Sequence, residues 1–506
     1  MIANWPWDRK NGPNSGILFP AGWILGKWNP KARRIFLLDR RAGGYDGSPM
    51  NRIAKNASLF LAVCALNCTG LHAEEEIIGQ VMDTDRTDWW GGNGITGDWF
   101  GVRTTLSDRG IDIFGSYTVD VFGNTTGGLK TGTVYAGSLQ FGADVDLENL
   151  VGWKGGSVST TWLWLSGRDA SEDLVGNFLT ISNIAGFNTL RMLELWFQQN
   201  VFDDKISLRV GQLAADSEFI ISDYGGLFIN GTFGWPAFTY MNLLAGGPGY
   251  PMGTPGLRLA LQPVDWFTFM TAAFQGDVFE QDVNRHGFRY RLDSTTGFTF
   301  INEAQFRWNH AEDESGLPGA IKSGVWFQTG RFADALADST RSGNLGAYWI
   351  LDQMLCREPV SSVESRVSGK GPSDFKNARQ SAPIAVEKSD QGLGFFTRIA
   401  FTPEDRNYVN FYFDAGLSYK GLIPSRDDDT LGIAFGYAQI SNGARSSLRD
   451  EGSTPLGAEM VLEATYQVQV NNWFVVQPDL QFIINPNATS EPGNALLLGF
   501  RGEVTF

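Results

Sequence analysis

The chain has 506 residues, with 40 Lys and Arg against 55 Asp and Glu, and a formal net charge of -15 at pH 7. This acidic balance disfavours nucleic-acid binding, which needs clustered basic side chains, and a hydrophobic share of 42% is too high for a disordered acidic chain. Three Cys and three His leave little for a disulfide framework or a multi-histidine metal site. A membrane-spanning helix would need an apolar run of about 18 residues, which the sequence lacks. We therefore expect neither a metal nor a cofactor.

Residues 50–73 have the order of a secretory signal peptide. Arg52 and Lys55 are basic, residues 57–66 are apolar, and the segment ends on the small residue Ala73. The apolar part is about ten residues long, which is too short to cross a bilayer as a helix. The segment therefore predicts export, with cleavage after Ala73.

The residues before this signal are interpreted as an extension that is not structured. A signal peptide normally begins a chain, so residues 1–49 are best explained by a misassigned translation start, with an extended export signal as the alternative. The mature protein would then consist of an N-terminal segment, 74–96, and a single domain over 97–506.

Along the mature chain, apolar and polar side chains mostly alternate, with a period of two residues. In residues 459–470, for example, apolar side chains such as Leu462 alternate with polar ones such as Glu463. Strand geometry places the two sets on opposite faces. Such runs are about 10 to 12 residues long, which is the length that a tilted strand needs to cross a bilayer. A soluble sandwich also alternates, but its strands average about 5 to 6 residues, so the pattern favours an all-β fold, a transmembrane antiparallel β-barrel.

This template finds sixteen candidate strands, and an even number fits a bacterial barrel. They are 111–122, 135–146, 157–166, 189–199, 206–213, 256–262, 266–275, 297–308, 320–330, 345–354, 392–402, 408–419, 430–440, 459–470, 473–484 and 495–506.

The lengths of the links agree with a barrel in all but one region. Short turns fall at the periplasmic end, at 263–265 and 471–472, and long links fall outside, at 167–188, 214–255, 276–296 and 441–458. The long link 355–391 and the short link 403–407 reverse this asymmetry. We therefore expect one strand to be misplaced between residues 331 and 407.

The third outer loop, 214–255, is long, rich in Gly and aromatic residues, and too apolar to be solvated. Loops longer than about 15 residues in a compact fold usually have a function or are disordered. We expect this loop to fold into the barrel lumen, with packing over the outer rim as the alternative.

Each predicted strand has one polar face, and the side chains on that face are the ones expected to line a pore. The candidates are Glu194, Trp196, Gln198, Arg209, Arg258, Glu303, Arg307, Arg398 and Arg501. Aromatic rings stack on the apolar faces of sugars, and charged or amide groups exchange hydrogen bonds with hydroxyl groups. We expect Glu194, Trp196 and Arg209 to form a constriction against the third loop. The alternative for each charge is that it pairs with another and holds a loop.

Enzymatic explanations find little support. A lipase needs a Ser and His pair, but His286 and His310 fall at predicted loop edges. The pair Glu194 and Glu303 is weak evidence for glycoside hydrolysis, because an acidic chain offers many such pairs. The protein is therefore expected not to be an enzyme.

The start of the domain resembles the GDWGGxRxxLxxxGI opening of the OprB-type carbohydrate-selective porins, except that Phe100 replaces a Gly. The matching opening residues are Gly97, Asp98, Trp99, Gly101 and Arg103, and the end of the chain is similar to the family at Gln477, Pro478 and Asp479. Interior segments such as Asp216 and Tyr250-Pro251 also look like the family's interior.

The resemblance covers roughly 97–506 and implies a function that periodicity does not show. It implies a porin of the bacterial outer membrane that passes monosaccharides such as glucose by passive diffusion. It also implies a homotrimer in contact with the bilayer and its lipopolysaccharide. The alternatives are a channel for other solutes, or a structural barrel that does not conduct.

Overall fold

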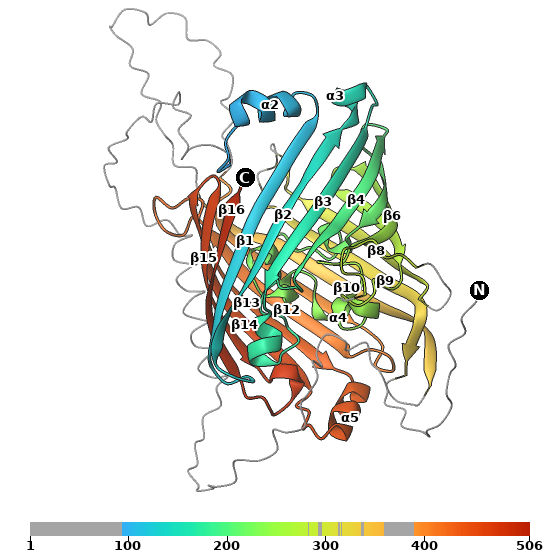
Figure 1. Ribbon diagram of the computed structural model, residues 1–506, viewed down its shortest axis with the longest axis vertical. Coiled ribbons are helices and arrows are strands. Elements are labelled where there is room, and N and C mark those ends of the chain that lie inside the picture. The colour runs from blue at the N-terminus through green and yellow to red at the C-terminus, as the bar shows by residue number, and fades with distance from the viewer. Residues whose placement is uncertain are drawn as a thin grey trace, which may run out of the picture.

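The computed structural model describes residues 94–281, 283–291, 296–311, 314, 316–334, 339–358 and 389–506. The predicted extension 1–49, the signal peptide 50–73 and nearly all of the segment 74–96 lie outside these residues. The described part of the predicted domain 97–506 forms one closed structure (Figure 1).

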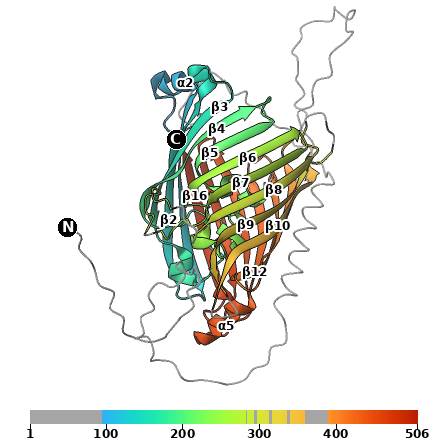
Figure 2. The same ribbon diagram turned by 90° about the vertical axis from the view of Figure 1, so that its right-hand side faces the viewer.

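Sixteen antiparallel strands form a closed barrel in which each strand pairs with its neighbours along the chain and β1 pairs with β16 (Figures 1 and 2). The strands are β1 (Ile111–Thr126), β2 (Gly132–Asp146), β3 (Gly156–Gly167), β4 (Thr189–Val201), β5 (Ile206–Leu213), β6 (Thr254–Val264), β7 (Phe267–Gln275), β8 (Phe298–Trp308), β9 (Gly319–Ala333), β10 (Thr340–Arg357), β11 (Gly392–Phe401), β12 (Val409–Lys420), β13 (Thr430–Ile440), β14 (Ala458–Asn471), β15 (Phe474–Ile484) and β16 (Ala495–Thr505). The predicted β-barrel of sixteen strands is confirmed.

Helices are short and lie in the links. They are α2 (Val102–Ser107), α3 (Leu147–Val151), α4 (Ala237–Tyr240) and α5 (Asn442–Asp450), the π-helical turn η2 (Ser171–Val175), and the 3-10 turns η1 (Trp99–Gly101), η3 (Ala215–Ser217), η4 (Gly225–Leu227), η5 (Gly231–Phe233), η6 (Leu244–Gly246) and η7 (Pro486–Ala488). Within the described ranges, no helix has the length and apolar character needed to cross a membrane.

The strands alternate between an exposed apolar face and a buried face, as the period of two predicts. In β9, Val325 and Phe327 are 47% and 43% exposed, whereas Trp326 and Gln328 are fully buried. In β14, Glu463 is likewise buried. The exposed apolar residues form the face toward the bilayer, and we call the opposite face of each strand the inward face.

The expectation of a misplaced strand between residues 331 and 407 is wrong. Strands β9 to β12 lie where the alternation placed them, and the link 402–408 is short. Its buried Asn407 closes this link, because the side-chain amide donates hydrogen bonds to Pro403 O and Asn344 Oδ1, both at about 2.9 Å. The asymmetry of link lengths is a tendency of barrels, and this tightly bonded link departs from it.

Two links carry most of the buried residues outside the strands. We call residues 168–188 the β3–β4 segment and residues 214–253 the β5–β6 segment. Both contribute to the largest buried hydrophobic cluster, for example through Phe178 and Phe238. Their contacts with the strands define the candidate site.

Candidate functional site

Carboxylates on the inward faces hold the β5–β6 segment by its backbone. Glu463 of β14 accepts hydrogen bonds from the N–H groups of Ile229 at 2.6 Å and Asn230 at 3.0 Å. Glu303 of β8 accepts one from the N–H group of Ile220 at 3.0 Å. These buried backbone N–H groups would otherwise lack partners, which is costly, so the two side chains fix the path of the segment.

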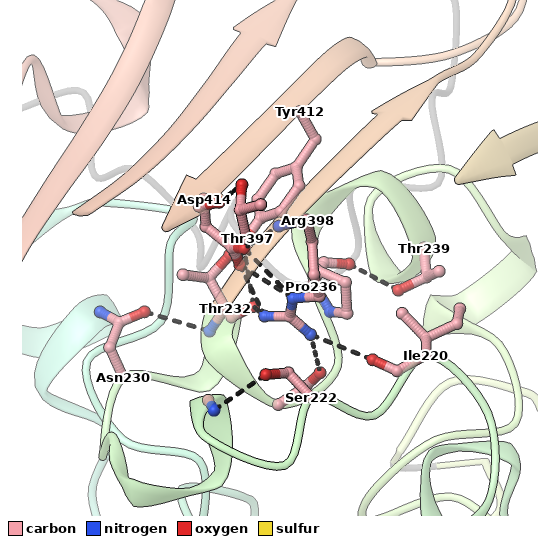
Figure 3. Close-up of polar contacts among 12 residues, drawn as sticks. Ile220, Ser222, Asn230, Thr232, Pro236, Thr239, Thr397, Arg398, Tyr412 and Asp414 are labelled. Carbon is pink, nitrogen blue, oxygen red and sulfur yellow. Dashed lines mark hydrogen bonds and ion pairs between the residues drawn. The ribbon is translucent and has the colours of Figure 1, made fainter. Parts of the chain in front are cut away.

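Arg398 of β11 fixes the same segment from another side (Figure 3). Its Nε and Nη2 donate to the carboxylate of Asp414 at 3.0 and 2.6 Å. The remaining donors reach backbone carbonyls of Ile220, Thr232 and Gly234, at 3.2, 2.9 and 3.0 Å. Arg398 is 1% exposed and Asp414 is fully buried. A buried pair of this kind is tolerated because every donor has a partner.

The β3–β4 segment is held against the β5–β6 segment. Glu459 of β14 accepts hydrogen bonds from the N–H groups of Phe178 at 3.1 Å and Leu179 at 2.6 Å. The N–H group of Gly231 donates to Thr180 O at 2.7 Å. The two segments therefore form one bonded unit on the β14 side of the barrel.

A cavity of about 670 Å³ lies between these two segments and the inward faces of β1, β2 and β16. Its lining combines aromatic rings with hydrogen-bonding groups, including Trp235, Tyr240, Tyr250, Ser116, Gln140, Asn183 and Arg501. Rings and polar groups together are the two elements that a sugar site requires.

Arg501 contributes a guanidinium to the cavity wall. Its Nε and Nη2 donate to the carboxylate of Asp120 at 2.7 and 2.8 Å, and Nη2 also donates to Asn183 Oδ1 at 2.6 Å. Ser182 Oγ donates to the same carboxylate at 2.7 Å. The charge of Arg501 is thus balanced by Asp120, and its position is fixed.

Acidic side chains dominate the charged part of the lining. Burial raises the pKa of Asp169 to about 6 and the pKa of Asp216 to about 7. The N–H group of Tyr250 donates to Asp216 at 2.7 Å and offsets part of that rise. The charged groups in the lining are Asp169, Glu172, Asp216, Glu503 and Arg501.

A second cluster joins β4, β5 and β6. The Arg209 guanidinium lies 3.9 Å from the ring centroid of Trp196, and Arg209 Nε donates to Gln198 at 2.9 Å. Arg258 donates to the same Gln198 oxygen at 2.9 Å and pairs with Glu218 at 2.8 Å. The sequence-predicted Trp196, Gln198, Arg209 and Arg258 are therefore neighbours.

The structure separates the nine predicted pore residues into two groups. Arg501 lines the cavity, and the other eight lie outside its lining. Glu194 accepts a hydrogen bond from the N–H group of Ala214 at 2.9 Å, and Arg307 donates to Gln305 at 3.1 Å. The binding of sugar by these residues stays a prediction.

The opening motif builds a turn before β1. Asp98 accepts hydrogen bonds from the hydroxyl and the N–H group of Thr104, both at 2.8 Å, and these bonds lower the pKa of its carboxyl. Arg103 lies over the ring of Trp99 at 5.5 Å and donates to Ile113 O at 3.2 Å. Gly97 and Gly101 have φ values of 63° and 86°, which favour glycine. These motif residues are therefore structural.

The closing motif lies on β15. Gln477 donates to Leu227 O of the β5–β6 segment at 2.8 Å, Pro478 is exposed on the outer face, and Asp479 accepts a hydrogen bond from Gln481 at 3.0 Å. Gln477 and Asp479 thus lie on the inward face of β15.

Sequence reasoning missed most of the cavity lining, because it lies on links to which no period applies. The strand period does not identify Trp235, Tyr240 or Asn183, although the unusual aromatic content of the β5–β6 segment is a signal. Asp216 and Tyr250 are indicated by the family resemblance alone. Across the part of the chain that the structure describes, no three His, Cys, Asp or Glu side chains gather as a metal site would require.

Comparisons with known proteins agree with this geometry. Porin B of Pseudomonas aeruginosa is 24% identical over 453 residues, covering 81% of this chain and 91% of that protein. The putative porin QuiX of Acinetobacter baylyi is 21% identical and covers 85% and 97%. The high-pH structure of Pseudomonas putida OprB superposes with a TM-score of 0.69 at 23% identity, covering 82% of this chain and 99% of that one, which supports the fold. The family model described as carbohydrate-selective porin, OprB family, matches residues 130–506. The chain therefore belongs to the OprB family of carbohydrate-selective porins.

Proposed function

We propose that monosaccharides such as glucose diffuse passively across the bacterial outer membrane through the cavity between the two segments and the wall of β1, β2 and β16. The observation that carries this proposal is the lining, in which Trp235, Tyr240 and Tyr250 face a space of about 670 Å³ together with polar side chains. A pyranose has apolar faces and a hydroxyl rim, so rings and hydrogen-bonding groups replace its hydration shell as it passes.

Substrate selection would come from geometry more than from charge. Arg501 is balanced by Asp120 and oriented by Asn183, so it offers fixed donors to hydroxyl groups without a large net field. The β5–β6 segment narrows the barrel because inward carboxylates and Arg398 hold it. In this proposal Glu303 and Arg398 position the segment, while Glu194, Trp196, Gln198, Arg209, Arg258 and Arg307 shape the approach to the cavity.

Export and assembly are part of the same proposal. The signal-like residues 50–73 support export through the periplasm, and family membership supports a homotrimer in contact with lipid and lipopolysaccharide. N-terminal sequencing of the outer-membrane protein should begin near Glu74. Cross-linking of native membranes should give a species of three chains, and a monomer alone would contradict the trimer.

The test is the block of ion current by glucose in a planar bilayer. Trp235→Ala should weaken glucose block several-fold. A nucleobase gains about 1–3 kcal/mol from stacking on an aromatic ring, and a sugar face, which has no π system, should gain about 1 kcal/mol, a several-fold change in affinity. Trp164→Ala is the matched control, since Trp164 is 53% exposed on the outer face of β3.

Two outcomes would contradict the proposal. Wild-type channels whose current glucose does not reduce would favour a channel for other solutes, and a barrel without conductance would favour a structural role. Family and fold are those of channels, and hydrolysis of a glucoside by the purified protein would contradict the expectation that it is not an enzyme.

A further inference from the structure

Arg191 is turned inward by a β-bulge near the start of β4. In the pairing of β3 with β4, Thr161 lies opposite Glu194 and Trp162 lies opposite Met192, so Leu193 is an extra residue. Strict alternation from Glu194 would place Arg191 on the lipid face. The bulge reverses the parity, and a bulge commonly re-aims a side chain beside a functional site.

The guanidinium of Arg191 is fully buried among apolar groups. It lies over the ring of Phe187 at 5.5 Å, and Nη1 contacts the sulfur of Met252 at 2.7 Å. A thioether is a weak acceptor. Among the described residues, Nε and Nη2 of Arg191 have no hydrogen-bond partner, and no ion pair includes this residue. An uncompensated buried charge is strongly unfavourable.

The unpartnered atoms form one edge of the guanidinium, and the molecule shows what that edge binds. In Arg398 and Arg501, Nε and Nη2 together hold the carboxylates of Asp414 and Asp120. Arg426 uses the same two atoms to hold Asp429. This edge matches a carboxylate in geometry and charge. In Arg191, the same pair of donors is free of any such group within the described chain.

We propose that Arg191 is a binding site for the carboxylate of a sugar acid that enters from the cavity, an inference that rests on the proposed function. Met252 lines the cavity and lies directly against the guanidinium. Its unbranched side chain adapts readily to neighbouring groups. Arg191 itself lies behind the lining. Displacement of Met252 by a solute would open the guanidinium to the cavity from its Nη1 end, where Nη1 and the unpartnered Nη2 would hold a carboxylate side by side. The protein would then pass acidic as well as neutral sugars, although Asp169, Asp216 and Glu503 line the same space.

The test compares block of ion current by glucuronate and by glucose, which differ by a carboxylate at C6. In Arg191→Gln, the half-blocking concentration of glucuronate should rise about tenfold or more, because charge-assisted hydrogen bonds are lost, while that of glucose stays unchanged. Arg168→Gln is the matched control, since Arg168 is an exposed arginine paired with Asp173 on the β3–β4 segment. Met252→Ala should strengthen glucuronate block by opening access.

The outcomes separate this inference from the proposed function. Unchanged glucuronate block in Arg191→Gln overturns the inference and leaves glucose diffusion intact, whereas wild-type channels insensitive to glucose overturn the proposed function. Equal block by inorganic phosphate overturns the assignment to a carboxylate. If Arg191→Gln does not assemble, the inference is tested by comparing glucuronate and glucose block in the wild type. Glucuronate should block at least as well as glucose despite the acidic lining, and a much weaker block overturns the inference.

Discussion

The two sides of the barrel's inner wall use the same residue types differently. On the side of β8 to β15, Arg398 and Glu463 are buried and bonded to the backbone of the β5–β6 segment. On the side of β1, β2 and β16, Arg501 pairs with Asp120 within the wall and faces open space. Alternation along the strands places both arginines on inward faces. The paths of the β3–β4 and β5–β6 segments therefore decide which arginine holds the structure and which contacts a solute.

The largest effect should come from Arg398, on the side that holds the segment. Arg398→Met leaves Asp414 buried without its partner, which costs about 3–5 kcal/mol, and it frees the carbonyls of Ile220, Thr232 and Gly234. The segment should then loosen. We expect the folded barrel to lose its folded-state mobility on a gel at a lower temperature, and we expect single-channel currents to become larger and noisier. Arg449→Met, at an exposed position of α5, is the control. Identical currents in both variants would mean that Arg398 does not position the segment.

The second comparison sets the outer face against the inner face within one strand. Leu462→Arg places a charge toward lipid at a cost of about 2–4 kcal/mol, so assembly into outer membranes should fall sharply. Glu463→Gln keeps an acceptor for Ile229 and Asn230, so the barrel should still assemble. Western blots of membrane fractions measure both, and equal loss would contradict the assignment of faces.

A smaller effect is expected in the cluster beside the cavity. Trp196→Ala removes the ring under Arg209, a contact worth about 1 kcal/mol, and the freed guanidinium should weaken glucose block by a few-fold at most. Titration of glucose against single-channel current measures this effect. A larger loss than in Trp235→Ala would place the constriction at Trp196 instead of in the cavity.

The smallest effect should be a dependence of ion selectivity on pH. Burial raises the pKa of Asp216 to about 7 and that of Asp169 to about 6, so both lose their negative charge as the pH falls from 8 to 5. Preference for cations, read from the reversal potential in a KCl gradient, should decrease over this window. Asp216→Asn should show a smaller change, and a preference that rises on acidification would contradict the prediction.

The barrel could be predicted because lipid-facing and inward-facing side chains alternate regularly along each strand. All sixteen ranges were found from alternation alone, since each strand must present an apolar face to lipid and pair with both neighbours. The prediction failed where the period breaks. The bulge at Leu193 turns Arg191 inward, which strict alternation cannot foresee. The reversed link lengths near residue 402 depend on the buried bonds of Asn407.

The candidate site was less predictable for a related reason. Parity identified inward charges such as Arg501 and Arg398 but could not say which of them the segments cover. Trp235 and Asn183 reach the cavity through tertiary contacts of irregular backbone, for example the hydrogen bond from Trp235 Nε1 to Gly246 O at 3.0 Å. Such contacts depend on residues far apart in the sequence, which no local pattern encodes.

The most direct test of the central claim, that sugars pass through this cavity, is to fill it. Gly226 lines the cavity, and a Cβ built there meets no atom within 4 Å. Gly493, in the outer link before β16, has equally open surroundings and serves as the matched control. In liposomes swollen by glucose, Gly226→Trp should reduce the swelling rate strongly, whereas Gly493→Trp should match the wild type. An unchanged rate in correctly assembled Gly226→Trp would contradict the account.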